Sequence, residues 1–366
     1  MSTQINRTHL AQLRKVEEAR FLANHKKSSE AFADSCKVMH EGVPMSWMAK
    51  WPGAHPVFVK EAKGAKFTDI DGNTYIDFCL GDTGSMTGHS PDATIAAIKR
   101  QADIGITSML PTLDAAVVAK ELAARFGLPK WQFTVTATDA NRHVIRYCRL
   151  ITGRSKIIVI DRCYHGSVDE TFATLDDAGN TVKREGNLGA PVDLAVTTRV
   201  VEFNDLAGME AALAHGDVAA ILMEPAMTNV GIVLPEDGYL YAVQDLAKKY
   251  GALLIIDETH TISVGPGGMT QDLGLRPDFL TIGKAIAGGI PVGTFGMTED
   301  VANSIKKLVE LEIVDTGGIG STLAGNALSL AAMRATLSEV LTAAAFKEMI
   351  ALGDRWSDGV DAAIAE

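Results

Sequence analysis

Cysteine is scarce in this chain: the 366 residues include four, Cys36, Cys79, Cys148 and Cys163. No two of them have the Cys-x-x-Cys spacing of zinc and redox sites, so neither a metal site nor a disulfide framework is expected. A reducing, cytoplasmic compartment fits this composition. We therefore expect no metal among the cofactors.

Long apolar runs and a basic excess are missing too. No stretch of about 18 apolar residues suggests a membrane-spanning helix, and the polar, charged segment 1–30 is unlike a secretory signal. The formal net charge is −11 at pH 7, which is opposite in sign to the basic surface of a typical nucleic-acid-binding protein. A nucleotide-binding dehydrogenase would need Gly-x-Gly-x-x-Gly between its first strand and helix, and that motif is absent. Small molecules are therefore the expected partners, rather than nucleic acid or a membrane.

The pattern along the chain predicts an α/β fold. Helix-forming, mixed-charge text over 8–37 indicates one or two surface helices, and residues 66–77 indicate a hairpin. Beyond residue 89, helical patterns alternate with short apolar runs, at 156–160, 219–223, 253–256 and 279–282. This alternation is typical of a mostly parallel sheet covered on both faces, in which ligands bind beyond the carboxyl ends of the strands. The polar stretch 174–197 is expected to be a mobile surface loop.

Lys284 is the most informative residue, because it lies between an apolar strand and a glycine-rich loop. A buried ammonium is costly, whereas a neutral lysine is a good nucleophile toward an aldehyde. Asp257 ends the preceding apolar run. If the two strands are parallel neighbours, both side chains face one crevice, as pyridoxal phosphate chemistry requires. An ordinary structural ion pair is the alternative.

Three further segments could contribute to such a site. Residues 136–141 have the pattern of a strand end followed by a helix start, which could hold a phosphate or be an ordinary capped helix. Tyr164 could stack on a planar cofactor with His165 as a hydrogen-bond partner, or both could lie in a surface loop. The hydroxyls of Ser321 and Thr322 precede an alanine-rich helix, again as an anion site or as a cap.

The order of these motifs resembles the class III, fold-type I, pyridoxal-phosphate-dependent aminotransferases, closest to the glutamate-1-semialdehyde aminomutase-like branch. The resemblance extends from about Val57 to about Leu337 and includes Asp71 to Asp77, Gly88 to Pro91 and, most specifically, Gly283 to Pro291. It implies a mostly parallel seven-stranded sheet in a three-layer α/β/α large domain, with a small second domain only partly present. It also implies pyridoxal 5'-phosphate as the cofactor.

The resemblance assigns roles position by position. Lys284 would form the internal aldimine, and Asp257 would pair with the pyridinium nitrogen. The other implied cofactor contacts are Ala137 and Thr138 at the phosphate, Tyr164 with His165 at the ring, Glu224 and Asn229 near the phenolic oxygen, and Thr259, which occupies the position of a ring-packing valine. Thr322 would reach the phosphate of the partner subunit, which implies a homodimer.

Departures from the family pattern fall on the phosphate turn and the substrate pocket. Ala137 replaces a glycine, so the turn is either altered or uses ordinary backbone angles. The arginine that holds the substrate carboxylate in aminomutases aligns with Met48, next to Trp47, and a Ser-Trp pair aligns with Gly81 and Asp82. His260 follows Thr259. Trp47, Met48, Asp82 and His260 are thus the candidate substrate contacts, and the glutamate-1-semialdehyde pocket is not reproduced.

Three regions are predicted along the chain. Residues 1–66 would be a helical and irregular segment at the small domain and the active-site entrance, and 67–310 the large cofactor domain. Residues 311–366 would comprise the phosphate-contact loop and a long helix, about Leu323 to Glu366, that leads into a truncated C-terminal small domain.

The predicted activity is the transfer of an amino group between an amino acid or amine donor and a keto acid acceptor. A pyridoxal-phosphate-dependent aminomutase, racemase or other amino-acid-transforming enzyme of the same fold is the alternative, because these enzymes differ in substrate placement rather than in Lys284 or Asp257. A non-catalytic relative that kept the fold is a third possibility.

Overall fold

The computed structural model describes residues 5–309 and 318–365. The described residues up to Leu80, together with Gly88–Ser90, form one compact unit, and Gly81–Thr87 with the described residues from Pro91 onward form a second. The predicted boundary after residue 66 stays a prediction, and the one between residues 310 and 311 lies outside the described residues.

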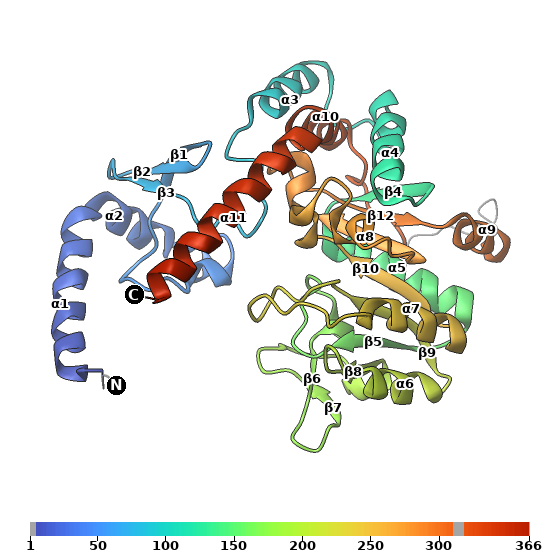
Figure 1. The fold of residues 1–366 in the computed structure, drawn as a ribbon. Coiled ribbons are helices and arrows are strands. Elements are labelled where there is room, and N and C mark those ends of the chain that lie inside the picture. The colour runs from blue at the N-terminus through green and yellow to red at the C-terminus, as the bar shows by residue number, and fades with distance from the viewer. Residues whose placement is uncertain (1–4, 310–317, 366) are drawn as a thin grey trace. The chain divides into compact units, whose positions relative to one another are not determined.

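The first unit contains two helices and a small antiparallel sheet (Figure 1). Its elements are α1 (Arg7–Asn24), α2 (Lys26–Ser35), β1 (Val59–Lys63), β2 (Lys66–Asp69) and β3 (Thr74–Ile76), with 3-10 turns at His40–Gly42 and Ser46–Ala49. The predicted helices and hairpin are confirmed. Asp71 at the hairpin turn accepts hydrogen bonds from the backbone N–H groups of Lys27 (2.7 Å) and Ser28 (3.0 Å). This carboxylate therefore caps α2 as well as forming the turn.

The second unit is built on a seven-stranded sheet, as predicted. In spatial order its strands are β4 (Lys130–Thr134), β12 (Gly293–Met297), β11 (Phe279–Gly283), β10 (Leu253–Asp257), β9 (Val218–Met223), β5 (Lys156–Ile160) and β8 (Thr198–Val201). The pairs from β11 through β8 are parallel, and β12 runs antiparallel to both of its neighbours. β9 is buried along its whole length, which explains why its sequence is continuously apolar.

Helices pack on both faces of this sheet (Figure 1). The helices of the second unit are α3 (Asp92–Ile104), α4 (Leu113–Phe126), α5 (Ala137–Thr152), α6 (Leu206–Ala214), α7 (Tyr239–Tyr250), α8 (Gly268–Asp272), α9 (Glu299–Leu308), α10 (Ala327–Ala335) and α11 (Ala343–Ala365). α5 packs against β4, β9, β11 and β12. It begins where the Thr136 side chain accepts the N–H of Asp139, and it ends at Gly153 in the left-handed region. These two caps set the ends of α5, and its N-terminus follows the carboxyl end of β4.

One expectation about the chain is incomplete and another is wrong. Segment 174–197 contains a short hairpin, in which β6 (Ala173–Leu175) pairs with β7 (Thr181–Lys183), and its mobility stays a prediction. The long helix expected from Leu323 is broken: α10 ends at Ala335, a π-helical turn follows over Thr336–Val340, and α11 begins at Ala343. The buried Arg125 donates to the carbonyls of Leu337 and Leu341. These bonds satisfy carbonyls at the break, so the chain can turn there.

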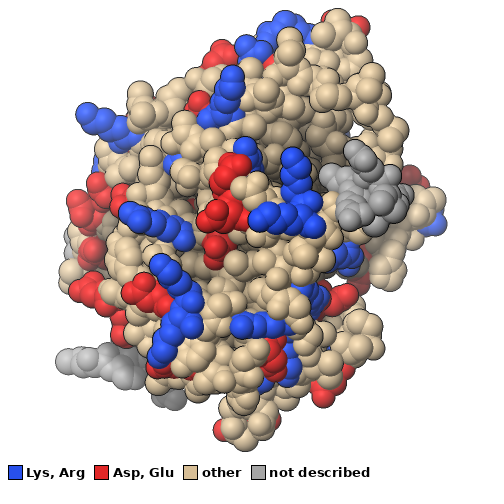
Figure 2. Space-filling model, turned by 90° about the vertical axis from the view of Figure 1, so that its right-hand side faces the viewer, with Lys and Arg blue, Asp and Glu red and all other residues tan. Residues whose placement is uncertain are grey.

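The surface carries both signs of charge. Figure 2 shows Lys and Arg side chains interspersed with Asp and Glu on the face that it presents, rather than gathered in one basic patch. None of the helices in the described part of the chain combines the length and apolarity that crossing a bilayer requires.

Candidate active site

A cavity of about 320 Å³ lies at the carboxyl ends of β10 and β11. Asp257 ends β10, and Lys284 directly follows β11, its parallel neighbour. The cavity is lined by most of the predicted site residues: Ala137, Thr138, Tyr164, His165, Glu224, Asp257, Thr259, His260 and Lys284. The sheet therefore brings together side chains that are up to 147 positions apart in the sequence, from 137 to 284.

Lys284 has an unusual backbone conformation. Its φ is 51°, in the left-handed region that costs an L-residue ~1–2 kcal/mol. Its Nζ donates to Asp82 Oδ2 at 2.6 Å and lies 2.7 Å from His260 Nε2. Backbone strain of this kind is retained where the surrounding structure holds a side chain for a purpose.

Asp257 is buried in a hydrogen-bonded network. Its Oδ2 accepts from Asn141 Nδ2 (3.0 Å) and lies 2.8 Å from His165 Nδ1, while Oδ1 accepts the N–H of Thr259 (3.0 Å). Burial alone would raise the pKa of Asp257, but the hydrogen bond and positive charge of His165, with the bonds from Thr259 and Asn141, hold it below its ordinary value. An ionised Asp257 can therefore stabilise the protonated, cationic form of a buried group beside it.

Asn141 is a member of the site that the sequence did not single out. Besides Asp257, it donates to the His165 carbonyl (3.2 Å) and accepts from the Thr281 hydroxyl (2.7 Å). It is fully buried on α5 among apolar neighbours such as Ala140 and Val144. A polar residue on the buried face of a helix is the signal that could have identified it.

The start of α5 meets the loop of Tyr164 closely. Ala137 is helical and is not among the residues with positive φ, so the turn uses ordinary angles. Thr138 Oγ1 accepts the N–H of Ser167 at 3.1 Å. Gly166, with φ 77°, leaves the space that Thr138 occupies, since a Cβ there would overlap the threonine side chain. The N–H groups of Ala137 and Thr138 belong to the first turn of α5, where a helix leaves its N–H groups without an intrahelical acceptor.

Glu258, beside Asp257, has a structural role. Its buried carboxylate accepts the N–H groups of Met269 and Thr270 and the hydroxyls of Thr261 and Thr270. It thereby caps α8 and fixes the chain just beyond Asp257. Burial raises the pKa of Glu258, although these hydrogen bonds oppose the rise.

Of the predicted contacts to the cofactor ring and its phenolic oxygen, Asn229 alone does not line the cavity. Tyr164 is partly exposed and meets Phe172 edge-on, with ring centroids 6.2 Å apart. Glu224 is buried, and burial raises its pKa. Asn229 is absent from the lining and donates instead to the Arg162 carbonyl at 2.9 Å. Asn229 therefore anchors the loop that leads to Tyr164.

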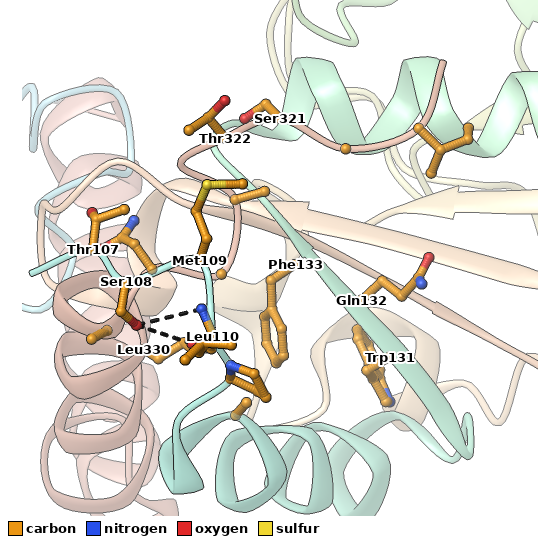
Figure 3. A pocket seen from close by; sticks show the side chains of 18 of the residues that line it. Thr107, Ser108, Met109, Leu110, Trp131, Gln132, Phe133, Ser321, Thr322 and Leu330 are labelled. Carbon is orange, nitrogen blue, oxygen red and sulfur yellow. Dashed lines mark hydrogen bonds between the residues drawn. The ribbon is translucent and has the colours of Figure 1, made fainter. Parts of the chain in front are cut away.

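Thr322 lies in a different cavity, of about 680 Å³, which shares no lining residue with the first. Figure 3 shows Ser321 and Thr322 at one side of it, with Met109 and Phe133 nearby. Trp47 and Met48 belong to the first unit, where they line an apolar hollow of about 370 Å³. Thr322 therefore does not line the cavity of Lys284, and the roles of Trp47 and Met48 stay predictions.

Comparison with known proteins identifies the class. The model of the family "Aminotransferase class-III" matches residues 47–364, and the chain belongs to this family of pyridoxal-phosphate-dependent enzymes, with the fold-type I architecture.

The individual relatives are more specific. A crystal structure of a glutamate-1-semialdehyde-aminomutase from Pseudomonas aeruginosa PAO1 superposes with a TM-score of 0.94 at 49% identity, covering 98% of this chain and 80% of that one. A curated glutamate-1-semialdehyde 2,1-aminomutase from Anaeromyxobacter dehalogenans is 34% identical over 87% of this chain and 73% of its own length. An omega-transaminase from Sphaerobacter thermophilus is 28% identical, with a TM-score of 0.82, covering 91% of this chain and 77% of its own.

The residues at the cavity fit the family's cofactor. Its buried wall holds two polar atoms without a partner in the described residues, His165 Nε2 and Thr259 Oγ1. A buried polar atom without a partner is costly, so both suit a site that a polar molecule completes. The N–H groups at the start of α5 suit a phosphate.

Proposed function

We propose that this chain transfers amino groups with pyridoxal phosphate held between Lys284 and Asp257. The observation that carries the proposal is the meeting of these two side chains in one cavity, at the ends of neighbouring parallel strands. When bound, the cofactor supplies an aldehyde that condenses with an amine and a protonated ring that accepts electron density. The remaining chemistry falls to residues of the chain.

Asp257 and its network would act at the ring nitrogen. The lowered pKa of Asp257 keeps the carboxylate ionised, so it can stabilise a proton on that nitrogen. Tyr164 would cover one face of the ring, and Glu224 would lie toward its phenolic oxygen. Ala137 and Thr138 would hold the phosphate through their backbone N–H groups. We assign Asn229 to positioning, through its bond to the Arg162 carbonyl.

Lys284 would have two tasks. Its Nζ would hold the cofactor's aldehyde end. When free, the same amine would be placed to hold or move a proton at the substrate carbon, because it stays tethered in the cavity.

The relatives favour the aminomutase alternative over a two-substrate transaminase. The relatives named above include two glutamate-1-semialdehyde aminomutases. An aminomutase moves the amino group within one molecule, whereas a transaminase needs a separate keto acceptor. The omega-transaminase relative, at lower identity, keeps the second function as a candidate. We place either reaction in a reducing compartment, in line with the four free cysteines.

The substrate is proposed to differ from glutamate 1-semialdehyde. Asp82 stands at a position that the resemblance assigns to that substrate's pocket, and its carboxylate lies 2.6 Å from Lys284 Nζ. A carboxylate there would repel the single carboxylate of glutamate 1-semialdehyde. An amine or amino acid without an acidic group at this position suits the site better.

We also propose a homodimer. The cavity around Thr322 is flanked by exposed apolar side chains, with Met109 at 78% and Leu110 at 73% exposure (Figure 3). Exposed apolar patches of this kind mark interfaces. Thr322 lies apart from the Lys284 cavity of its own chain, which suits a role at the cofactor of a second copy.

A donor and acceptor panel tests the activity. Purified protein loaded with pyridoxal phosphate is given candidate amines, with and without a keto acid, while cofactor absorbance and products are followed. Turnover that needs no keto acid and yields an isomer supports the aminomutase. Strict dependence on a keto acid supports the transaminase. A protein that never acquires the absorbance of attached cofactor, or a Lys284→Ala variant that keeps it, would overturn both.

A further inference from the structure

The Nζ of Lys284 belongs to a short chain of polar side chains. Asp82 Oδ2 lies 2.6 Å from it, His260 Nε2 lies 2.7 Å from it, and His260 Nδ1 lies 2.7 Å from Thr83 Oγ1. An ammonium group can only donate hydrogen bonds. His260 must therefore accept at Nε2 and carry its hydrogen at Nδ1, from which it donates to Thr83. The geometry fixes one tautomer of the imidazole.

The backbone that presents these groups is strained. Gly81, Asp82 and Thr83 have φ values of 55°, 53° and 72°, and Lys284 has 51°. Successive left-handed residues are rare outside glycine. The loop directs Asp82 toward Lys284 and Thr83 toward His260, although its left-handed backbone conformation is unfavourable for these residues.

The groups around His260 and Asp82 shift the pKa values of these two side chains in opposing directions. Burial, and then the neighbouring Lys284 ammonium, lower the pKa of His260, while Asp82 and Asp257 act to raise it. Burial would raise the pKa of Asp82, but the hydrogen bond and charge of Lys284, with His260, hold it below its ordinary value. Glu224 also lines the cavity. The contacts thus place a carboxylate and an imidazole against the same nitrogen, Lys284 Nζ.

This arrangement poses a problem for Lys284 as a nucleophile. An ammonium has no lone pair, and Asp82 Oδ2 accepts a hydrogen bond from Nζ. A base must remove a proton before the amine can attack an aldehyde. His260 Nε2 holds an open lone pair directed at Nζ, and it is the neutral group in contact with that atom.

We propose that His260 is the proton acceptor that activates Lys284, with Thr83 as a positioning residue. One proton moves from Nζ to Nε2, and the N–H electron pair stays on Nζ as the nucleophilic lone pair. The imidazolium that forms is stabilised by the nearby Asp82 and Asp257 carboxylates, and Thr83 Oγ1 holds its other N–H. The same path run backward returns the proton when an incoming amine displaces Lys284. The inference rests on the proposed function only in taking Lys284 as the amine that attacks an aldehyde.

The test uses cofactor-free protein and does not depend on turnover. Pyridoxal phosphate is added across a range of pH, samples are quenched with borohydride, and mass spectrometry measures the modified fraction of the Lys284 peptide. His260→Gln should slow attachment at neutral pH by about 10²-fold, the lower end for general acid–base catalysis, and the loss should shrink as the pH rises. Thr83→Val should slow it in part, and Thr83→Ser should restore it.

Asp82→Asn gives the opposite sign. The substitution removes the carboxylate that competes with His260 for the proton on Nζ, so attachment at neutral pH should be faster than in the wild type. A distorted site would slow both variants, whereas the proposal requires them to diverge. His215→Gln, at the C-terminal end of α6, is the control and should match the wild type.

The outcomes separate the two proposals. Normal rates and pH dependence in His260→Gln, with an unchanged unfolding midpoint, would show that solvent takes the proton and would overturn the relay alone. A wild-type protein whose Lys284 is never modified would overturn the proposed function, and the relay with it.

Discussion

Substitution of Gly166 by alanine tests the close approach between the Tyr164 loop and α5. Gly166 has φ 77°, and a Cβ there would overlap the side chain of Thr138. Gly127 is a matched control, because it has φ 72° and no atom lies within 4 Å of the position that a Cβ would take. Alanine in the left-handed region costs ~1–2 kcal/mol at either position. Overpacking adds ~1–3 kcal/mol at Gly166 alone.

The two variants should therefore differ in both stability and cofactor binding. We expect Gly127→Ala to lose ~1–2 kcal/mol and Gly166→Ala ~2–5 kcal/mol. Each kcal/mol corresponds to about 2–4 °C in the thermal midpoint of a domain of this order of size. Because relief of the overlap displaces Thr138 and its bond from Ser167, Gly166→Ala should also weaken pyridoxal phosphate binding, measured by titration of the cofactor-free protein.

Equal destabilisation of the two variants would refute this reasoning, since it would show that the contact with Thr138 is not constrained. Normal cofactor affinity in Gly166→Ala would refute the link between that contact and the phosphate end of the cavity.

Three other substitutions probe separate features. Glu258→Ala removes the carboxylate that accepts from two N–H groups and two hydroxyls and should cost ~1–3 kcal/mol for each buried donor left without an acceptor; the exposed Glu185→Ala should change thermal unfolding little, and similar midpoints for both would contradict the capping role. Asp257→Asn probes pH dependence: the lowered pKa of Asp257 means that its charge contributes stability above its ordinary pKa, and this contribution is lost as the pH falls through the lowered value. The cost of Asp257→Asn should thus be present at neutral pH and shrink in acid, and a cost independent of pH would contradict it. Leu110→Glu should shift the proposed homodimer to monomer in sedimentation experiments, whereas Leu188→Glu, 92% exposed elsewhere on the surface, should not; a dimer that survives Leu110→Glu would remove this face from the interface.

The sheet could be predicted because its strands are short, buried apolar runs. β5 begins and ends as its text suggests, and β9, β10 and β11 differ from prediction by a residue at an end. β12 was not predicted: its Gly293 and Gly296 carry no side chain to mark a strand. Both glycines are required by close neighbours, the Thr136 carbonyl and the Trp131 ring. This need for glycine arises from packing in the folded structure and leaves no hydrophobic periodicity in the sequence.

The site was predictable at strand ends and less so elsewhere. Asp257 and Lys284 follow apolar runs directly, so parallel pairing is enough to bring them together. Thr83 and Asn141 were not predicted, because their hydrogen-bond partners are distant in sequence. Thr83 lies 177 positions from His260, and Asn141 lies 116 positions from Asp257. The alanine at position 137 depends on a second residue, Gly283, so inspection of position 137 alone could not explain it. A Cβ on Gly283 would come within 3.0 Å of the Ala137 Cβ, so a glycine in one segment makes room for the alanine of another.

The left-handed backbone of Lys284 has a consequence for how sequences of this fold can drift. Asparagine tolerates this conformation better than lysine, and the Asp82 carboxylate is 76% exposed, so the ion pair lost with the lysine is worth little. An inactive Lys284→Asn descendant would thus fold at least as stably as the wild type. Selection for folding alone would discard the lysine, and its persistence at this position would be a sign of selection for chemistry.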